Sequence, residues 1–165
     1  METKNVARAV ILTALAVGLS TFSIPVGISK VFPGQHLVNV LAAVMLGPWY
    51  AVAIALAVGI IRNVAGLGTP LAFPGGMIGA FLAGVMFKYF RNIYLAALGE
   101  VVGTGLFGAL VSVLFVAPMF MGKTMPVFTI IIAFSASTIV GSILGVVGLH
   151  ILSRAGLREV YDKSN

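Results

Sequence analysis

The chain has 165 residues, of which 60% are hydrophobic and only 8% are charged. A soluble domain carries roughly 25% charged residues, so this composition excludes a soluble globular surface and indicates a protein that lies in lipid. The absence of cysteine excludes a disulfide framework and thiolate chemistry. The net charge of +6 comes from Lys and Arg residues scattered singly at the ends of apolar runs, which is typical of membrane-topology signals and not of a nucleic-acid-binding surface.

The lengths of the apolar runs predict an all-α fold, with six transmembrane helices in one domain that covers residues 1–165. The first run could pass for a signal peptide, but we interpret it as a spanning helix. The second and fourth helices are expected to be short, because about eleven residues give only ~17 Å against a hydrocarbon core of ~30 Å. In chain order, the expected helices are 6–23, 36–46, 49–66, 76–90, 93–117 and 127–154.

The distribution of cations predicts the orientation in the membrane. A turn at Gly47–Pro48 separates the second helix from the third, since glycine suits the end of a helix and proline suits a start. Six helices with both termini in the cytoplasm then place most Lys and Arg residues inside and leave only Lys30, Arg62 and Lys123 near the outside. We therefore expect a multi-pass protein of the cell membrane, whose long outer loops are 24–35, 67–75 and 118–126.

Polar side chains gather in the outer half of the second and third helices. Gln35, His36 and Asn39 open the second helix, and Arg62 and Asn63 lie near the outer end of the third. Because polar groups that face lipid cost free energy, these side chains are expected to converge inward, on one another or on a ligand. The alternative is that Arg62 snorkels to lipid headgroups while His36 and Asn39 cap the short helix.

Two aromatic residues, Phe32 and Phe73, occupy the expected outer loops beside this polar group. Each could stack on a flat ligand, although burial of the loops alone would equally explain them.

Glu100 is the only acidic residue within an expected span. It begins a stripe of small or polar residues at four-residue spacing along the fifth helix. We expect Glu100 to form a structural pair with His150, which has a similar depth on the sixth helix. The alternative is a role of this pair in binding, gating or proton coupling.

The first helix carries a small-residue face that could dock another membrane protein or pack within the bundle. The residues of this candidate docking face are Ala9, Thr13, Ala14, Ala16 and Gly18. Elsewhere the sequence has no Ser/His/Asp set, no HExxH, no metal-spaced cluster and no nucleotide-binding loop. We therefore expect neither an enzyme nor a bound cofactor or metal.

Residues 22–80 resemble the ThiW family, whose members are substrate-binding (S) components of energy-coupling-factor (ECF) vitamin transporters. The resemblance rests on the blocks FPGQH, NVLAA, LGPWYAV, RN and LAFPG, whereas the last two helices match in pattern. It implies capture, from outside, of hydroxyethylthiazole, the thiazole precursor of thiamin. It also implies partners, namely a transmembrane coupling protein and two cytosolic ATPases.

The resemblance implies roles for the residues described above. Gln35, His36, Asn39, Arg62 and Asn63 would supply donors and acceptors for a thiazole, with Phe32 and Phe73 among the apolar walls. The small face of the first helix would dock the coupling protein, although Thr13 and Gly18 stand where related S components have alanine. Arg62 would also suit a phosphorylated or carboxylated ligand. The alternative function is a stand-alone secondary transporter that uses Glu100 and His150 for protons.

Overall fold

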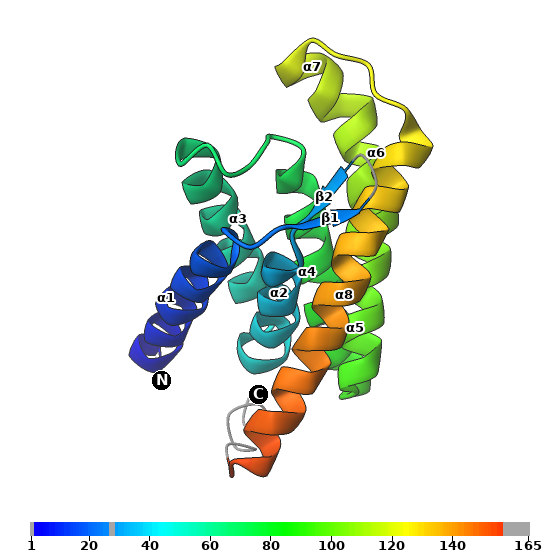
Figure 1. Ribbon diagram of the computed structural model, residues 1–165. Helices are drawn as coiled ribbons and strands as arrows, with labels where there is room; N and C mark the ends of the chain where they lie inside the picture. The colour runs from blue at the N-terminus through cyan, green and yellow to red at the C-terminus, as the bar shows by residue number, and fades with distance from the viewer. Residues whose placement is uncertain (1, 27–28, 157–165) are drawn as a thin grey trace.

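The computed structural model describes residues 2–26 and 29–156 (Figure 1). Its helices form a bundle in which successive passages of the chain alternate in direction. One end of this bundle, here called the terminal end, holds the start of the first helix and the end of the last. The opposite end, here called the loop end, holds the described parts of the long connections, namely residues 20–26, 29–32, 65–71 and 122–126.

The observed elements agree closely with the predicted ones. Two short strands, β1 and β2, pair antiparallel within the first long connection, with Ile24 opposite Val31. The fifth passage is a single helical path that includes two π-helical stretches, η1 and η2. In chain order, the elements are α1 (Glu2–Leu19), β1 (Ile24–Val26), β2 (Ser29–Val31), α2 (Pro33–Leu46), α3 (Pro48–Val64), α4 (Ala72–Phe90), α5 (Ile93–Val102), η1 (Gly103–Gly108), α6 (Ala109–Val111), η2 (Ser112–Val116), α7 (Ala117–Met121) and α8 (Val127–Arg154).

The helix starts follow from local sequence signals. Pro33 and Pro48 each occupy the first turn of a helix, where the missing N–H removes no hydrogen bond. Gly47, at φ 86°, makes the turn between α2 and α3, as predicted. Asn92 caps α5, because its side chain accepts from the backbone N–H groups of Tyr94 and Leu95.

The prediction of a short second helix is confirmed, and that of a short fourth helix is wrong. α2 has 14 residues, whereas α4 begins at Ala72 and reaches 19 residues. The prediction that this helix starts at residue 76 assigned the prolines and glycines before that residue to a loop. Pro74 is instead accommodated in the first turn of α4, where proline is tolerated.

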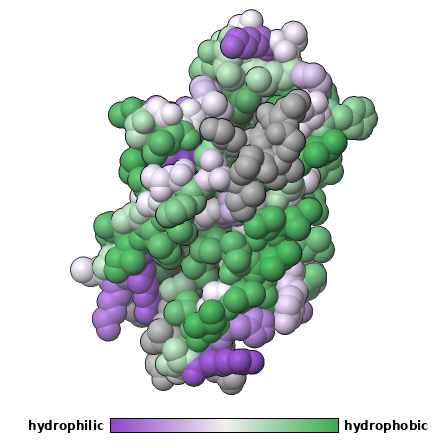
Figure 2. All heavy atoms as spheres, viewed as in Figure 1, coloured by the Kyte–Doolittle hydropathy of each residue, from purple (hydrophilic) through white to green (hydrophobic). Residues whose placement is uncertain are grey.

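The exterior of the bundle matches a lipid environment. Three helical stretches among the described residues are long and apolar enough to cross a membrane: Ala72–Phe90, Ile93–Met121 and Val127–Arg154. Figure 2 shows hydrophobic residues over most of the middle of the face drawn, and strongly hydrophilic residues near its two ends. The chain is therefore an all-α membrane protein with a small two-stranded pairing at its loop end.

Glycines bring α4 into close contact with the fifth passage. A Cβ added at Gly103 would lie 2.7 Å from the Cα of Gly79, and one added at Gly108 would collide with Gly75. Such backbone contact between helices requires residues without side chains. The packing fixes η1 directly against the first half of α4.

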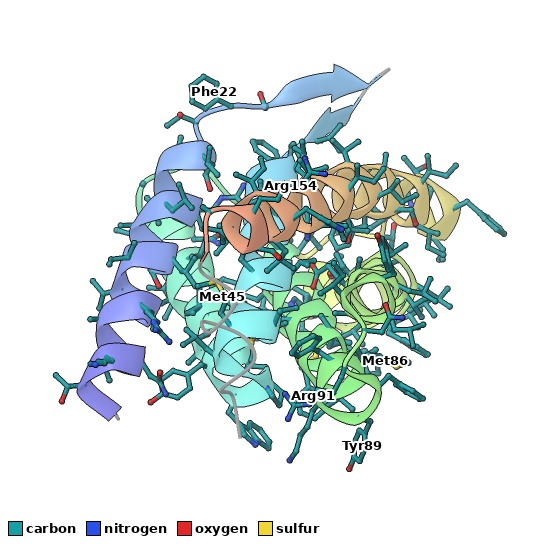
Figure 3. All side chains as sticks on the ribbon, turned by 90° about the horizontal axis from the view of Figure 1, so that it is seen from below. Phe22, Met45, Met86, Tyr89, Arg91 and Arg154 are labelled. Carbon is teal, nitrogen blue, oxygen red and sulfur yellow. The ribbon has the colours of Figure 1, made fainter. Side chains whose placement is uncertain are left out.

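The small face of α1 divides between the bundle and the exterior. Ala16 is only 1% exposed and packs into the core with Leu12. Ala14 and Gly18 are exposed, and no atom lies within 4 Å of a Cβ built at Gly18. Seen from the terminal end, α1 lies at one edge of the bundle (Figure 3).

The predicted docking face is therefore corrected in part. Ala16 is buried within the bundle and is unavailable to a partner, while Ala9 and Thr13 are half-buried on the same side. The prediction assigned residues from two opposite sides of the helix to a single docking face. Residues 14 and 18 are separated from residue 16 by about 200° around the helix axis, so they point the other way.

We predict that Ala16→Trp destabilises the bundle and that Ala14→Trp does not. A large ring has no space between α1 and the core at residue 16, and such overpacking costs about 1–3 kcal/mol or more. Residue 14 is exposed, so a tryptophan there does not have to enter the core. Thermal unfolding midpoints of both variants in one detergent would test this, and equal midpoints would contradict the packing of α1.

Candidate functional site

A cavity of about 400 Å³ lies toward the loop end, between α2, α3, α4, η1 and α8. Its polar lining consists of Gln35, His36, Arg62, Thr69, Thr104 and Ser137. Its remaining lining is apolar or glycine, namely Phe32, Gly66, Leu67, Gly68, Ala72, Gly75, Gly76, Ala133 and Phe134. The loop before α4 thus forms part of the wall, and the start of α2 forms another part.

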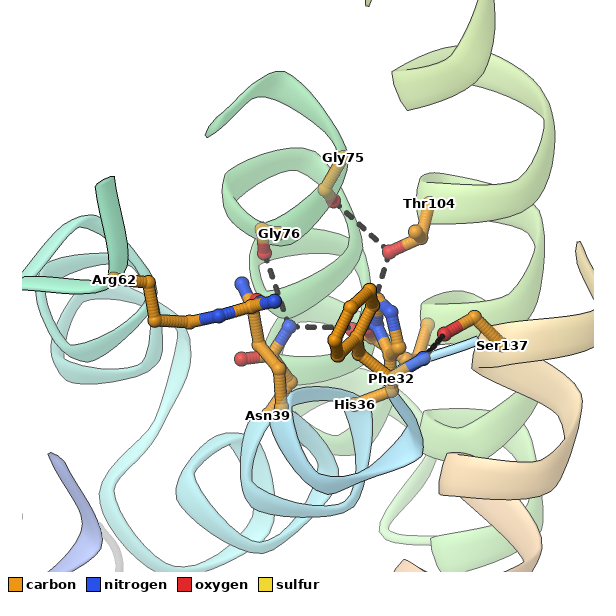
Figure 4. A network of polar contacts seen from close by, with 10 residues as sticks. Phe32, His36, Asn39, Arg62, Gly75, Gly76, Thr104 and Ser137 are labelled. Carbon is orange, nitrogen blue, oxygen red and sulfur yellow. Dashed lines mark hydrogen bonds and ion pairs between the residues drawn. The ribbon is translucent and has the colours of Figure 1, made fainter. Parts of the chain in front are cut away.

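Arg62 extends from α3 into this space (Figure 4) and is only 4% exposed. Its Nη1 donates to Oε1 of Gln35, and its Nη2 donates to the carbonyl of Leu67 at 3.3 Å. The guanidinium carbon lies 4.8 Å from the centre of the Phe32 ring, a cation–π distance. The alternative that Arg62 snorkels to headgroups is therefore wrong, since its charge is directed into the protein.

Glu100 is fully buried and is the shared partner in a network of polar side chains, of which His36, Asn39 and Thr104 are labelled in Figure 4. Its Oε1 is 2.8 Å from Nδ1 of His36 and accepts a hydrogen bond of 3.0 Å from Nδ2 of Asn39. The hydroxyl of Thr104 lies 3.0 Å from the same oxygen and 2.9 Å from the carbonyl of Gly75. One carboxylate thereby joins α2, α5 and η1.

The predicted pair of Glu100 and His150 does not form. His150 is exposed, with Nε2 3.4 Å from the Tyr94 hydroxyl and Nδ1 2.9 Å from the carbonyl of Val146. The prediction placed the start of α2 near the outer surface. Because α2 spans only ~21 Å, its first turn reaches only the middle of the bundle, and His36 meets Glu100 there.

The structure separates the predicted binding residues into two groups. Phe32, Gln35, His36 and Arg62 line the cavity, and their binding of a ligand stays a prediction. The other three support the walls: Asn39 also donates to the Gly76 carbonyl at 3.2 Å, Asn63 donates to the carbonyls of Gly59 and Thr69, and Phe73 packs against Gly59.

Several lining residues were not identified as site residues from the sequence. Phe134 and Ser137 come from α8, and Ser137 also accepts a 2.9 Å hydrogen bond from the Phe32 backbone N–H. The available signal was the polar segment FSAST within an otherwise apolar helix. Thr104 is part of the stripe of small or polar residues that begins at Glu100, but it was not predicted as a site residue. Among the described residues there is no group of three His, Cys, Asp or Glu that could hold a metal ion.

Comparison with known proteins identifies a family for this chain. A family model described as thiamine-precursor transporter protein (ThiW) matches residues 6–155, which is most of the chain. A search of the curated proteins finds no match.

We predict that Glu100→Ala lowers the free energy of unfolding by about 3–5 kcal/mol, the cost of removing one partner from a buried charged pair. Glu100→Gln should cost less, because it keeps the volume and one acceptor oxygen for Asn39 or Thr104. His150→Ala should change stability by no more than about 0.5 kcal/mol, since its side chain is exposed. Unfolding in mixed detergent would measure the three variants, and a larger effect of His150→Ala than of Glu100→Ala would contradict this network.

Proposed function

Because the chain belongs to the ThiW family of thiamine-precursor transporter proteins, we propose that it is the substrate-binding S component of an ECF importer. It captures hydroxyethylthiazole or a close relative from outside the cell. A transmembrane coupling protein and two cytosolic ATPases then drive release into the cytoplasm, so this chain itself catalyses no reaction.

The observation that carries this proposal is the cavity beneath the long loops. Its volume of about 400 Å³ falls within the range of small-molecule sites. Phe32 and Phe134 supply aromatic surface for a flat ring, and His36, Thr104 and Ser137 supply hydrogen-bonding groups for a ring nitrogen and a hydroxyl. A small heterocycle with few polar atoms needs this combination.

The distribution of charge supports an outward-facing cavity. Lys4, Arg8, Lys88, Arg91 and Arg154 all lie toward the terminal end. Among the other cations, Arg158 and Lys163 fall outside the described residues, and Lys30 and Lys123 lie in loop-end connections. By the positive-inside rule the terminal end faces the cytoplasm, and the loop end with its cavity faces outside.

The exposed side of α1 supports docking of the coupling protein. Ala14 and Gly18 present little side-chain volume at one edge of the bundle, so a partner helix can approach closely. The alternative of a proton-coupled transporter built on Glu100 and His150 loses its basis, because Glu100 instead pairs with His36.

We predict that the purified protein in nanodiscs binds hydroxyethylthiazole and that Ala133→Trp, which places a large ring against the cavity, abolishes binding. The matched control is Ala53→Trp on the exposed side of α3, which should bind like the unsubstituted protein. Calorimetric titration would measure binding, and mass spectrometry would identify small molecules that co-purify. Equal binding by both variants, or a co-purifying ligand unrelated to thiamin precursors, would contradict the proposal.

We predict that Ala14→Trp leaves ligand binding unchanged but lowers uptake at least about tenfold in liposomes that contain the coupling protein and ATPases, because the ring prevents close helix contact. Ala53→Trp again serves as the control and should retain uptake. Normal uptake by Ala14→Trp would exclude this docking side. Gradient-driven uptake by the chain alone, without ATPases, would exclude the S-component role.

A further inference from the structure

We propose that the ligand is an anion and that its negatively charged group binds Arg62, which makes the phosphate monoester of hydroxyethylthiazole a better ligand than the free alcohol. This inference rests on the proposed function and narrows its substrate class. It concerns the part of the cavity enclosed by α3, the loop before α4 and the first turns of α2 and α4.

The charge of Arg62 has no compensating carboxylate among the side chains that the structure describes. Glu100 is the only acidic residue whose side chain the structure describes, and its Oε1 lies 2.8 Å from Nδ1 of His36 rather than against Arg62. The contacts of Arg62 are all neutral: Gln35, the Leu67 carbonyl and the Phe32 ring. Its Nε is buried and has no hydrogen-bond partner among the described residues. A buried guanidinium with neutral neighbours is costly unless a bound anion or water completes its surroundings.

Backbone groups add to the positive potential of this space. The start of α2 contributes Gln35 and His36 to the cavity and has no side-chain cap. At the start of α4, the N–H groups of Ala72 and Phe73 already donate to the carbonyls of Thr69 and Pro70, so this start contributes only its helix dipole. The N-terminus of a helix carries partial positive charge and unpaired N–H groups, which favour anions. The backbone N–H groups of Gly68 and Thr69, both in the cavity wall, also donate no hydrogen bond within the described part of the chain.

A phosphate ester matches these donors better than an alcohol does. A phosphate has three terminal oxygens and can accept two parallel hydrogen bonds from one guanidinium while it accepts others from backbone N–H groups. An alcohol oxygen satisfies few of these donors and leaves the charge of Arg62 uncompensated. Esterification of the hydroxyl group adds this negative charge to the ligand. It leaves unchanged the thiazole ring, which the aromatic walls would contact.

The experiment compares two ligands and three substitutions. Hydroxyethylthiazole and its phosphate ester are each titrated into the full chain in nanodiscs, with Arg62→Gln, Arg62→Lys and the control Lys88→Gln. Lys88→Gln removes the same charge from an exposed position at the other end of α4. Thermal unfolding of each variant verifies that it is folded.

The unsubstituted protein and Lys88→Gln should bind the ester about tenfold or more tightly than the alcohol, as expected for charge-assisted hydrogen bonds. Arg62→Gln should lose this preference and bind the two ligands with similar affinity, and Arg62→Lys should retain part of the preference. If Arg62→Gln fails to fold, the inference is tested by the affinities of the unsubstituted protein and of Arg62→Lys for the two ligands.

Equal or tighter binding of the alcohol by the unsubstituted protein would overturn the inference and leave the proposed function standing. A preference for the ester that survives in folded Arg62→Gln would also overturn it, because Arg62 would then serve only to hold the Leu67 loop. If neither ligand binds to the folded protein, the inference and the proposed ligand both fail.

Discussion

The architecture depends on one carboxylate that the bundle encloses completely. Glu100 is 0% exposed, and its Oε1 interacts with His36, Asn39 and Thr104 from two neighbouring segments. Polar groups inside a membrane protein are expensive unless protein groups satisfy them, and three groups share this one oxygen. The other carboxylate oxygen, Oε2, has no hydrogen-bond partner among the described residues. The network sets the position of α2 relative to η1 and thereby the floor of the cavity.

Glycine packing and the polar network reinforce each other. Backbone contact between Gly103 and Gly79 brings Thr104 close enough to bond the Gly75 carbonyl, near the start of α4. The same first turns of α2 and α4 line the cavity. The site is therefore built from helix starts held by buried contacts, together with the loop before α4.

The helices and the polar lining on α2 and α3 could be predicted from sequence, because apolar run length and the depth of polar groups are local properties. Arg62, Gln35 and His36 were identified in this way. The partner of Glu100 was not identified, because the depth of His36 in the bundle depends on how far α2 reaches into it. The orientation of Ala16 and the contribution of Ser137 likewise depend on which helix faces pack together, and no single helix encodes that.

The hydrogen bond from the Phe32 backbone to Ser137 joins the segment before the second helix to the last helix of the fold. Phe134 and Ala133, on the same last helix, complete the wall of the cavity. During synthesis, the residues of α2 and α3 therefore leave the ribosome long before they enclose any space. The compartment comes into existence only when the final helix joins the others, so a chain that ends early has the polar groups but nowhere to hold a solute.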